Sequence, residues 1–194
     1  MPRPRTFDEA EVLERAVDLF REVGYERASI PELTDRLGSC RQSLYSSFGS
    51  KRDLYLAALA RYGAREVDAK LDELRAQRSP LDGLRGLLAG WAGFAEHCPT
   101  DGCLTVNAII EADDAEARAA VEVHVERLEA GLRAALAAAV EAGELRADTP
   151  VERLARAMIT TCYGIGVLGK LASSGPRLAD AVEDLLERLD GYAS

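Results

Sequence analysis

The sequence predicts an all-α fold in which a three-helix N-terminal domain precedes a six-helix C-terminal body. Three observations lead to this prediction. Apolar residues recur at helical spacing in almost every segment, most of these segments are bounded by helix start and stop residues, and none shows the alternation of a half-buried strand. With 194 residues, 47% of them hydrophobic and 29% charged, the chain has the composition of a soluble globular protein that can bury a continuous core.

The first 55 residues contain three predicted helices, and the second and third of them are short. The first ends before Gly24, where a left-handed cap fits, and its apolar stripe comprises Leu13, Ala16, Val17, Phe20 and Val23. The second begins at Ser29, with Glu32 placed as in a capping box, and ends at Gly38. The third covers residues 41–48. Two helices of about two turns, joined by a turn of three or four residues, have the form of a helix-turn-helix.

The rest of the chain is divided by similar signals into six further predicted helices. Their expected first residues or caps are Ser50, Ser79, Cys103, Asp113 or Asp114, Thr149 and Leu178. The helix after Thr149, with Pro150 at its first position and Glu152 completing a capping box, is expected to reach about Ala172. We predict two domains, residues 1–55 and residues 56–194.

Charge is distributed unevenly between these two domains. The net charge is -9, but residues 1–55 hold nine Arg or Lys against ten Asp or Glu, whereas residues 56–194 hold 15 against 23. A nearly neutral domain can bind DNA if its basic groups share one face, while an acidic body repels DNA elsewhere. The composition therefore allows a nucleic-acid partner for the N-terminal domain alone.

Membrane insertion, secretion and metal binding are not indicated. No apolar run approaches the roughly 20 residues that span a bilayer, and no apolar stretch follows the N-terminal arginines as in a signal peptide. Four scattered cysteines, Cys40, Cys98, Cys103 and Cys162, fit neither a disulfide framework nor a zinc site. We expect a cytoplasmic protein with no membrane partner, no metal and no cofactor.

The outward face of segment 41–48 carries side chains that suit DNA. Arginine can bond a guanine edge and glutamine an adenine edge through two hydrogen bonds, and hydroxyl groups or tyrosine can reach phosphates or thymine methyls. Leu44 and Phe48 hold the helix down, while Lys51 and Arg52 add positive charge beside it. The predicted DNA-binding residues of this helix are Arg41, Gln42, Ser43, Tyr45, Ser46 and Ser47.

The chain from Thr6 to Leu59 resembles the DNA-binding domain of the tetracycline-repressor (TetR) family, above all in the segment from Gly38 to Leu54, GSCRQSLYSSFGSKRDL. The resemblance implies an all-helical homodimer, usually a repressor, whose divergent C-terminal body binds a ligand and dimerises. It also assigns positions. Base reading falls to Arg41 and Gln42, and contact with backbone or methyl groups falls to Tyr45 and Ser47. Lys51 corresponds to the phosphate-binding lysine, and Ser29 lies at the start of the supporting helix, near a phosphate. Cys40 stands where a capping serine or threonine is common.

A second resemblance, carried by Gly102–Asn107 and Tyr163–Lys170, is to a branch of this family in which some members respond to reactive electrophiles or small hydrophobic compounds. It implies a small-molecule effector bound between helices of the body. The candidate effector-binding residues are Trp91, Phe94, His97, Cys103, Asn107, His124, Met158 and Tyr163. Core packing is the alternative explanation for these residues, because aromatic, methionine and occasional histidine side chains at helical spacing commonly face a core.

Two further expectations concern the C-terminal body. Gly164, Gly166 and Gly169 indicate close approach of a neighbouring helix, and the dimer interface is expected to comprise Ile159, Leu168, Leu178, Val182, Leu185 and Leu189. Cys103 lies at a helix N-terminus, which favours a thiolate, so it is a candidate redox sensor with Cys98 as resolving thiol. The simpler interpretation is that Cys103 is a packed residue of the first turn.

Enzyme classes are not favoured, because the sequence has no Glu-x-x-His pair, no glycine-rich phosphate loop and no His–Cys pair with catalytic geometry. The predicted function is a homodimeric regulator, in the first instance a repressor, that binds a palindromic operator and is released by a small-molecule inducer. The alternative is a DNA-binding regulator controlled by a protein partner or by thiol oxidation. A helical enzyme or carrier that retains a DNA-binding domain is the third hypothesis.

Overall fold

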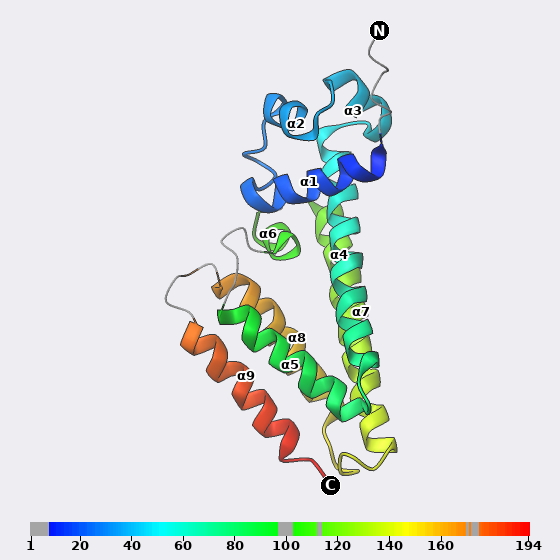
Figure 1. Ribbon diagram of the computed structural model, residues 1–194, viewed down its shortest axis with the longest axis vertical. Coiled ribbons are helices and arrows are strands. Elements are labelled where there is room, and N and C mark those ends of the chain that lie inside the picture. The colour runs from blue at the N-terminus through cyan, green and yellow to red at the C-terminus, as the bar shows by residue number, and fades with distance from the viewer. Residues whose placement is uncertain (1–7, 97–102, 112–113, 170, 172–174) are drawn as a thin grey trace. The chain divides into compact units, whose positions relative to one another are not determined.

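A computed structural model describes residues 8–96, 103–111, 114–169, 171 and 175–194 of the chain (Figure 1). In these residues it contains nine helices: α1 (Glu9–Val23), α2 (Ile30–Leu37), α3 (Arg41–Phe48), α4 (Lys51–Ala76), α5 (Pro80–Glu96), α6 (Leu104–Glu111), α7 (Ala115–Glu141), α8 (Val151–Leu168) and α9 (Gly175–Asp190). Within the same residues, β-pairing is limited to an isolated antiparallel bridge between Leu145 and Ala193. The predicted all-α fold, with three N-terminal helices followed by six, is confirmed.

Most helices begin at the caps that the sequence predicts. The hydroxyl oxygens of Ser29, Ser50 and Ser79 each accept a hydrogen bond from the backbone N–H three residues later, at 3.3, 3.1 and 3.2 Å. Asp114 caps α7 by accepting from two backbone N–H groups, at 2.9 and 3.3 Å. Gly38 ends α2 in the left-handed conformation, with φ of 63°, as predicted.

Helix α8 differs from its prediction at both ends. The Thr149 hydroxyl donates to the carbonyl oxygen of Arg146 at 2.6 Å, so it completes the preceding turn and does not cap the helix. Pro150 therefore precedes the first helical residue. At the other end α8 stops at Leu168, before the expected limit of about Ala172.

The described chain divides into two compact units, which we describe separately. Unit 1 comprises Met1–Ala64 and Cys103–Val121, and unit 2 comprises Arg65–Gly102 and Glu122–Ser194. Helices α4 and α7 therefore contribute their first part to unit 1 and the remainder to unit 2. Unit 1 contains α6 in addition to the three N-terminal helices. The functional division at residues 55 and 56 stays a prediction.

Unit 2 is built around one continuous apolar cluster. Helix α9 packs along α5 and also against α8 (Figure 1). The side chains in this cluster with the least exposure include Leu84, Leu88, Leu132, Leu136 and Val182. Burial of this kind is the main favourable contribution to folding.

The expected dimer interface is wrong for five of its six residues. Ile159, Leu178, Val182, Leu185 and Leu189 are only 0–6% exposed, because the apolar stripe of α9 and the matching side of α8 are covered within a single chain. Leu168, in contrast, is 42% exposed.

None of the described helices is long and apolar enough to cross a membrane.

Gly83 permits the close contact between the start of α5 and the end of α4. A Cβ atom at this position would lie 2.3 Å from the carbonyl oxygen of Leu74, a backbone atom that cannot rotate away. Gly93, in the same helix, is a matched control, because a Cβ there would meet nothing within 4 Å among the described residues.

We expect Gly83→Ala to lower the free energy of unfolding by about 1–3 kcal/mol through overpacking. Gly93→Ala is expected to raise it by up to about 1 kcal/mol, because alanine has the higher helix propensity. Urea denaturation of both variants measures these changes. Equal effects of the two substitutions would contradict the packing described for Gly83.

Candidate nucleic-acid interface

Helix α3 is held against unit 1 by few apolar contacts. Leu44 is the buried side chain of α3, and Leu33 and Leu37 of α2 are buried beside the turn that joins the two helices. Cys40 occupies the N-cap position but makes no side-chain bond to the backbone. Its Sγ lies 3.2 Å from the Ser43 hydroxyl, and this hydrogen bond lowers the pKa of the Cys40 thiol. Phe48 at the end of α3 is half-buried, and the polar side chains of the helix are half-buried or exposed.

The predicted DNA-binding residues of α3 form a largely exposed polar surface. Arg41, Gln42, Ser46 and Ser47 are exposed, and Ser43 and Tyr45 are half-buried. The Arg41 guanidinium lies over the Tyr45 ring, 5.3 Å from its centroid. The Ser46 hydroxyl donates to the Ser43 carbonyl oxygen at 2.9 Å, so the Ser46 oxygen remains available as a hydrogen-bond acceptor. Ser29 is exposed at the start of α2.

Lys51 is positioned by an aromatic cluster. Its ammonium nitrogen lies 4.5 Å from the centroid of the Tyr25 ring, which packs against Tyr55 at 4.7 Å between centroids. Phe20 contacts Tyr55 edge-on at 5.1 Å. Burial of Tyr55 raises its pKa to about 12, so the phenol stays neutral. Lys51 has no carboxylate partner among the described residues, and its charge is available to a phosphate.

Arg52, next to Lys51, is already paired. Its guanidinium donates to both carboxylate oxygens of Asp114, at 2.6 and 2.9 Å, and to Glu116 at 2.8 Å. The hydrogen bonds from Arg52 lower the pKa of Asp114 to about 2. The positive charge that the sequence predicts beside α3 at Arg52 is therefore offset by these two carboxylates. Sequence reasoning missed this pair because its members lie 62 positions apart.

Helix α6 is seated on the end of α1. Its residues from Leu104 to Ala108 are buried, and the Asn107 amide donates to the Arg21 carbonyl oxygen at 3.2 Å. One Glu111 carboxylate oxygen accepts from the backbone N–H of Tyr25 at 3.3 Å. Gly24 makes room for it, because a Cβ there would lie 2.6 Å from the same oxygen. Gly24 has φ of 80° with ψ of 169°, so it has a positive φ but not the predicted left-handed helical conformation.

The predicted effector-binding residues fall into separate parts of the structure. Cys103 and Asn107 belong to unit 1, where the carbonyl of the half-buried Cys103 accepts from the Asn107 N–H at the start of α6. Unit 2 holds Trp91, His124, Met158 and Tyr163. His97, Cys98 and the Phe94 side chain lie outside the described residues.

Two buried polar atoms of unit 2 lack a hydrogen-bond partner in the described part of the chain. They are the indole Nε1 of Trp91 and the Nδ1 of His124, on side chains that are 6% and 8% exposed. A buried group left unpaired costs about 1–3 kcal/mol. Burial lowers the pKa of His124, the charge of Arg127 lowers it further, and Asp68 opposes both. The neutral imidazole is therefore favoured, and neither group has a hydrogen-bond partner among the described residues.

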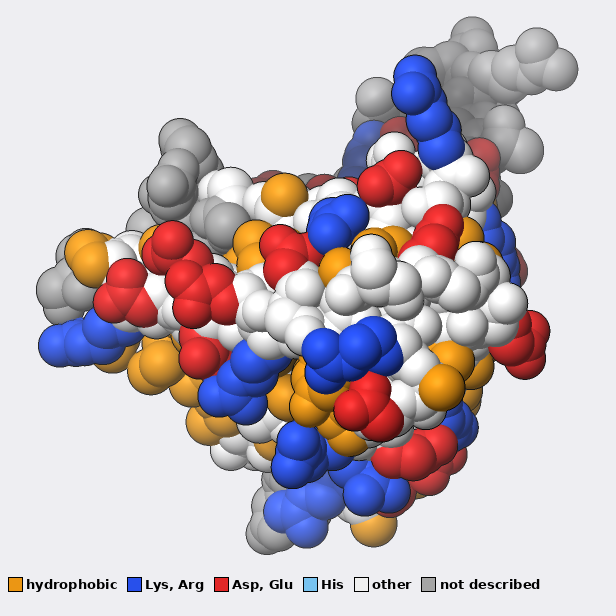
Figure 2. Space-filling view, turned by 90° about the horizontal axis from the view of Figure 1, so that it is seen from below, with side chains coloured by type: hydrophobic (Ala, Val, Ile, Leu, Met, Phe, Trp, Pro, Cys, Tyr) orange, Lys and Arg blue, Asp and Glu red, His pale blue; other side chains and the backbone are white. Residues whose placement is uncertain are grey.

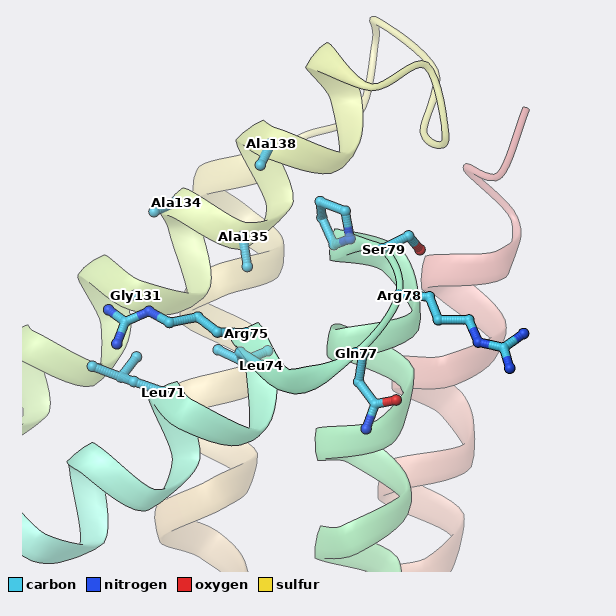
Figure 3. Close-up of a pocket in the computed structure, with 11 residues that line it drawn as sticks. Leu71, Leu74, Arg75, Gln77, Arg78, Ser79, Gly131, Ala134, Ala135 and Ala138 are labelled. Atoms are coloured by element: carbon cyan, nitrogen blue, oxygen red, sulfur yellow. The ribbon is translucent and has the colours of Figure 1, made fainter.

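A groove of about 370 Å³ lies elsewhere in unit 2, between the end of α4, the turn into α5 and the small side chains of α7 (Figure 3). None of the predicted effector-binding residues lines it. The N-terminal N–H groups of α5 beside it already bond to Ser79 and to Glu144, and Arg78 points away from the hollow. We assign no ligand to this groove.

The face drawn in Figure 2 and the acidic side chains of the described residues offer no second candidate site. Figure 2 shows one face on which Asp and Glu side chains are mixed with Lys and Arg, so this face presents no broad basic area for DNA. Among the described residues, no three His, Cys, Asp or Glu side chains are grouped so that they could hold a metal ion.

Comparison with known proteins gives consistent matches along the chain. The family model of bacterial regulatory proteins of the tetR family matches residues 12–58, and that of the tetracyclin repressor-like C-terminal domain matches residues 80–185. The HTH-type transcriptional regulator YezE of Bacillus subtilis is 33% identical over 98% of this chain and 100% of its own length. The HTH-type transcriptional repressor AcnR of Corynebacterium glutamicum is 27% identical, over 93% of this chain and 89% of its own.

Solved structures show the same relationship. A cysteine mutant of the TetR family transcriptional regulator CifR, complexed with a 26-bp double-strand operator DNA, has a TM-score of 0.81 and 34% identity. The match covers 95% of this chain and 98% of that one.

Proposed function

Because the chain belongs to the TetR family of bacterial regulatory proteins, we propose that it is a homodimeric, cytoplasmic repressor that a small-molecule effector releases from a palindromic operator. Its relatives are helix-turn-helix transcriptional regulators, and this family is not one of enzymes. The observation that carries the proposal is that the positive charges of Arg41 and Lys51 are not used in ion pairs within the described residues. Each lies over a tyrosine ring without a carboxylate partner among the described residues, whereas Arg36 and Arg52 of the same unit are in ion pairs.

The roles of the DNA-binding residues follow from their chemistry and exposure. Arg41 and Gln42, at the exposed start of α3, suit the edges of guanine and adenine in the major groove. The hydroxyl groups of Ser29, Ser43, Ser46 and Ser47, the Tyr45 phenol and the Lys51 ammonium suit phosphates. Two such helices in successive major grooves, about 34 Å apart, require a dimer.

Replacing the base-reading residues and the phosphate-binding residue should have different effects. Arg41→Ala and Gln42→Ala are each expected to reduce the preference for operator over scrambled duplex by about 1–3 kcal/mol, because a two-bond contact to a base is lost. Lys51→Ala should weaken binding to both duplexes by the same factor and reduce the slope of log K against log salt concentration by about one. Titrations with an operator selected from genomic fragments measure both quantities.

Arg75→Ala is the matched control, because the Arg75 side chain belongs to unit 2 and is 73% exposed. This substitution should leave the operator preference and the salt slope unchanged. An unaltered salt slope for Lys51→Ala, together with lost sequence preference, would show that the assigned roles are wrong.

The outer face of α8 is the proposed dimer interface. Val167 and Leu168 are each 42% exposed, and a Cβ at Gly164 would meet nothing within 4 Å among the described residues. The outer side of α9, in contrast, carries charged side chains such as Glu183, Asp184 and Glu187. An exposed apolar face with a glycine in it lets a second helix approach closely, and in a two-fold dimer the same face serves both partners.

We expect Val167→Glu to give a folded monomer that binds operator at least about tenfold more weakly, because a second half-site contact is lost. Glu183→Gln, on the outer side of α9, should remain a dimer. Sedimentation velocity and operator titration of the two variants make the comparison. If Val167→Glu sediments as an intact dimer, the interface lies elsewhere.

The two unpaired atoms of unit 2 indicate the chemistry of the effector. An indole N–H needs a hydrogen-bond acceptor, and a neutral imidazole carries no charge with which to pair a charged ligand. We therefore expect an uncharged, mostly apolar compound with at least one acceptor oxygen or nitrogen. To change a population from mostly bound to mostly free, it must favour the released form by about 5 kcal/mol.

Trp91 is the one tryptophan of the chain, so its fluorescence reports on a ligand that binds beside its indole. A panel of neutral aromatic compounds and their carboxylate analogues can be tested for a change in Trp91 emission and for operator release. Neutral compounds that do both, with the carboxylates inactive, are the expected result. Release without any change in emission, or release by peroxide that Cys103→Ser abolishes, would instead support control from another site.

A further inference from the structure

The end of α6 and the start of α7 reach the DNA-binding side of unit 1 at two points around Lys51. On one side, Glu111 accepts from the Tyr25 backbone N–H at 3.3 Å, and the Lys51 ammonium lies over the Tyr25 ring. This gives a continuous series of contacts from α6 to Lys51.

On the other side, Arg52 follows Lys51 directly in the first turn of α4. Its guanidinium donates three hydrogen bonds of 2.6–2.9 Å, two to the two oxygens of Asp114 and one to Glu116. The two-bond geometry fixes the orientation of the guanidinium as well as its place. The start of α7 therefore holds the turn of α4 that carries Lys51.

Stability alone is a weak reason for this arrangement. The side chains of Arg52 and Glu116 are 43% and 65% exposed, and exposed ion pairs contribute about 0–1 kcal/mol each. The same carboxylates also bring negative charge close to a residue that should bind phosphate. By Coulomb's law that placement opposes DNA binding unless the carboxylates also serve the contact in another way.

We propose that Glu111, Asp114 and Glu116 are positioning residues for Lys51 and that they set operator affinity through it. The inference rests on the proposed role of Lys51 as a phosphate contact and adds which side chains hold that contact in place. The three carboxylates themselves make no contact with DNA in this arrangement.

A purely electrostatic effect of the carboxylates and a positioning effect predict opposite changes in operator affinity, which makes the proposal testable. The double variant Asp114→Asn and Glu116→Gln removes two negative charges, so charge alone should tighten operator binding. Positioning predicts about 3- to 10-fold weaker binding and a salt slope lower by up to about one, because the phosphate contact of Lys51 is lost. Asparagine still accepts from the N–H groups at the start of α7, so the helix cap is retained.

The decisive comparison repeats the double variant in a Lys51→Ala background. If the carboxylates act through Lys51, they should have no weakening effect once Lys51 is gone. Glu22→Gln is the matched control, because it removes a carboxylate of unit 1 that pairs with Arg36 and touches neither Lys51 nor Arg52. It should leave operator binding unchanged or slightly tighter. Thermal unfolding of each variant identifies loss of fold, and Glu116→Gln alone serves as the milder variant if the double variant is unstable.

The outcomes separate this inference from the proposed function. Unchanged or tighter binding by the double variant, while Lys51→Ala still weakens binding, would overturn the positioning role alone. Equal weakening in the presence and absence of Lys51 would overturn it as well. If Lys51→Ala has no effect on binding, the phosphate contact itself is wrong and the inference is overturned with it.

Discussion

The packing of three aromatic rings, Phe20, Tyr25 and Tyr55, is the contact on which unit 1 depends. Phe20 comes from the end of α1, Tyr25 from the connection to α2, and Tyr55 from the first turns of α4. Their contact joins three segments that are separate in sequence, and ring pairs of this kind add about 0.5–1.5 kcal/mol beyond the area they bury. Lys51 lies on this cluster, and Glu111 binds the backbone of one of its members.

Helix α3 shows why such a platform is needed. An eight-residue helix is too short to be stable alone, and α3 has one fully buried side chain, Leu44, with which to hold itself. Its remaining residues are free to be polar, because α1, α2 and the start of α4 supply the order. The surface that suits DNA is thus made from side chains that contribute little to folding.

Local signals were sufficient to predict much of this architecture, while long-range pairing was not. The sequence predicts the bounds of α3 and the caps at Ser29 and Gly38 because each depends on residues within one turn. The apolar stripe of α9 is also evident, but periodicity shows only that Val182 and Leu185 are covered and not whether the cover is α5 of the same chain or a second copy. Arg52 and Asp114 meet only after the chain has folded, so the pair had no local signal.

Hydrogen–deuterium exchange of the full chain, free and bound to its operator, tests the central claim that unit 1 carries the DNA-binding surface with α3 at its centre. The account predicts slower exchange on binding in residues 41–54, accompanied by residues 104–117, because α6 and the start of α7 are attached to the same unit. Protection confined to residues 122–194, with exchange in α3 unchanged, would contradict it.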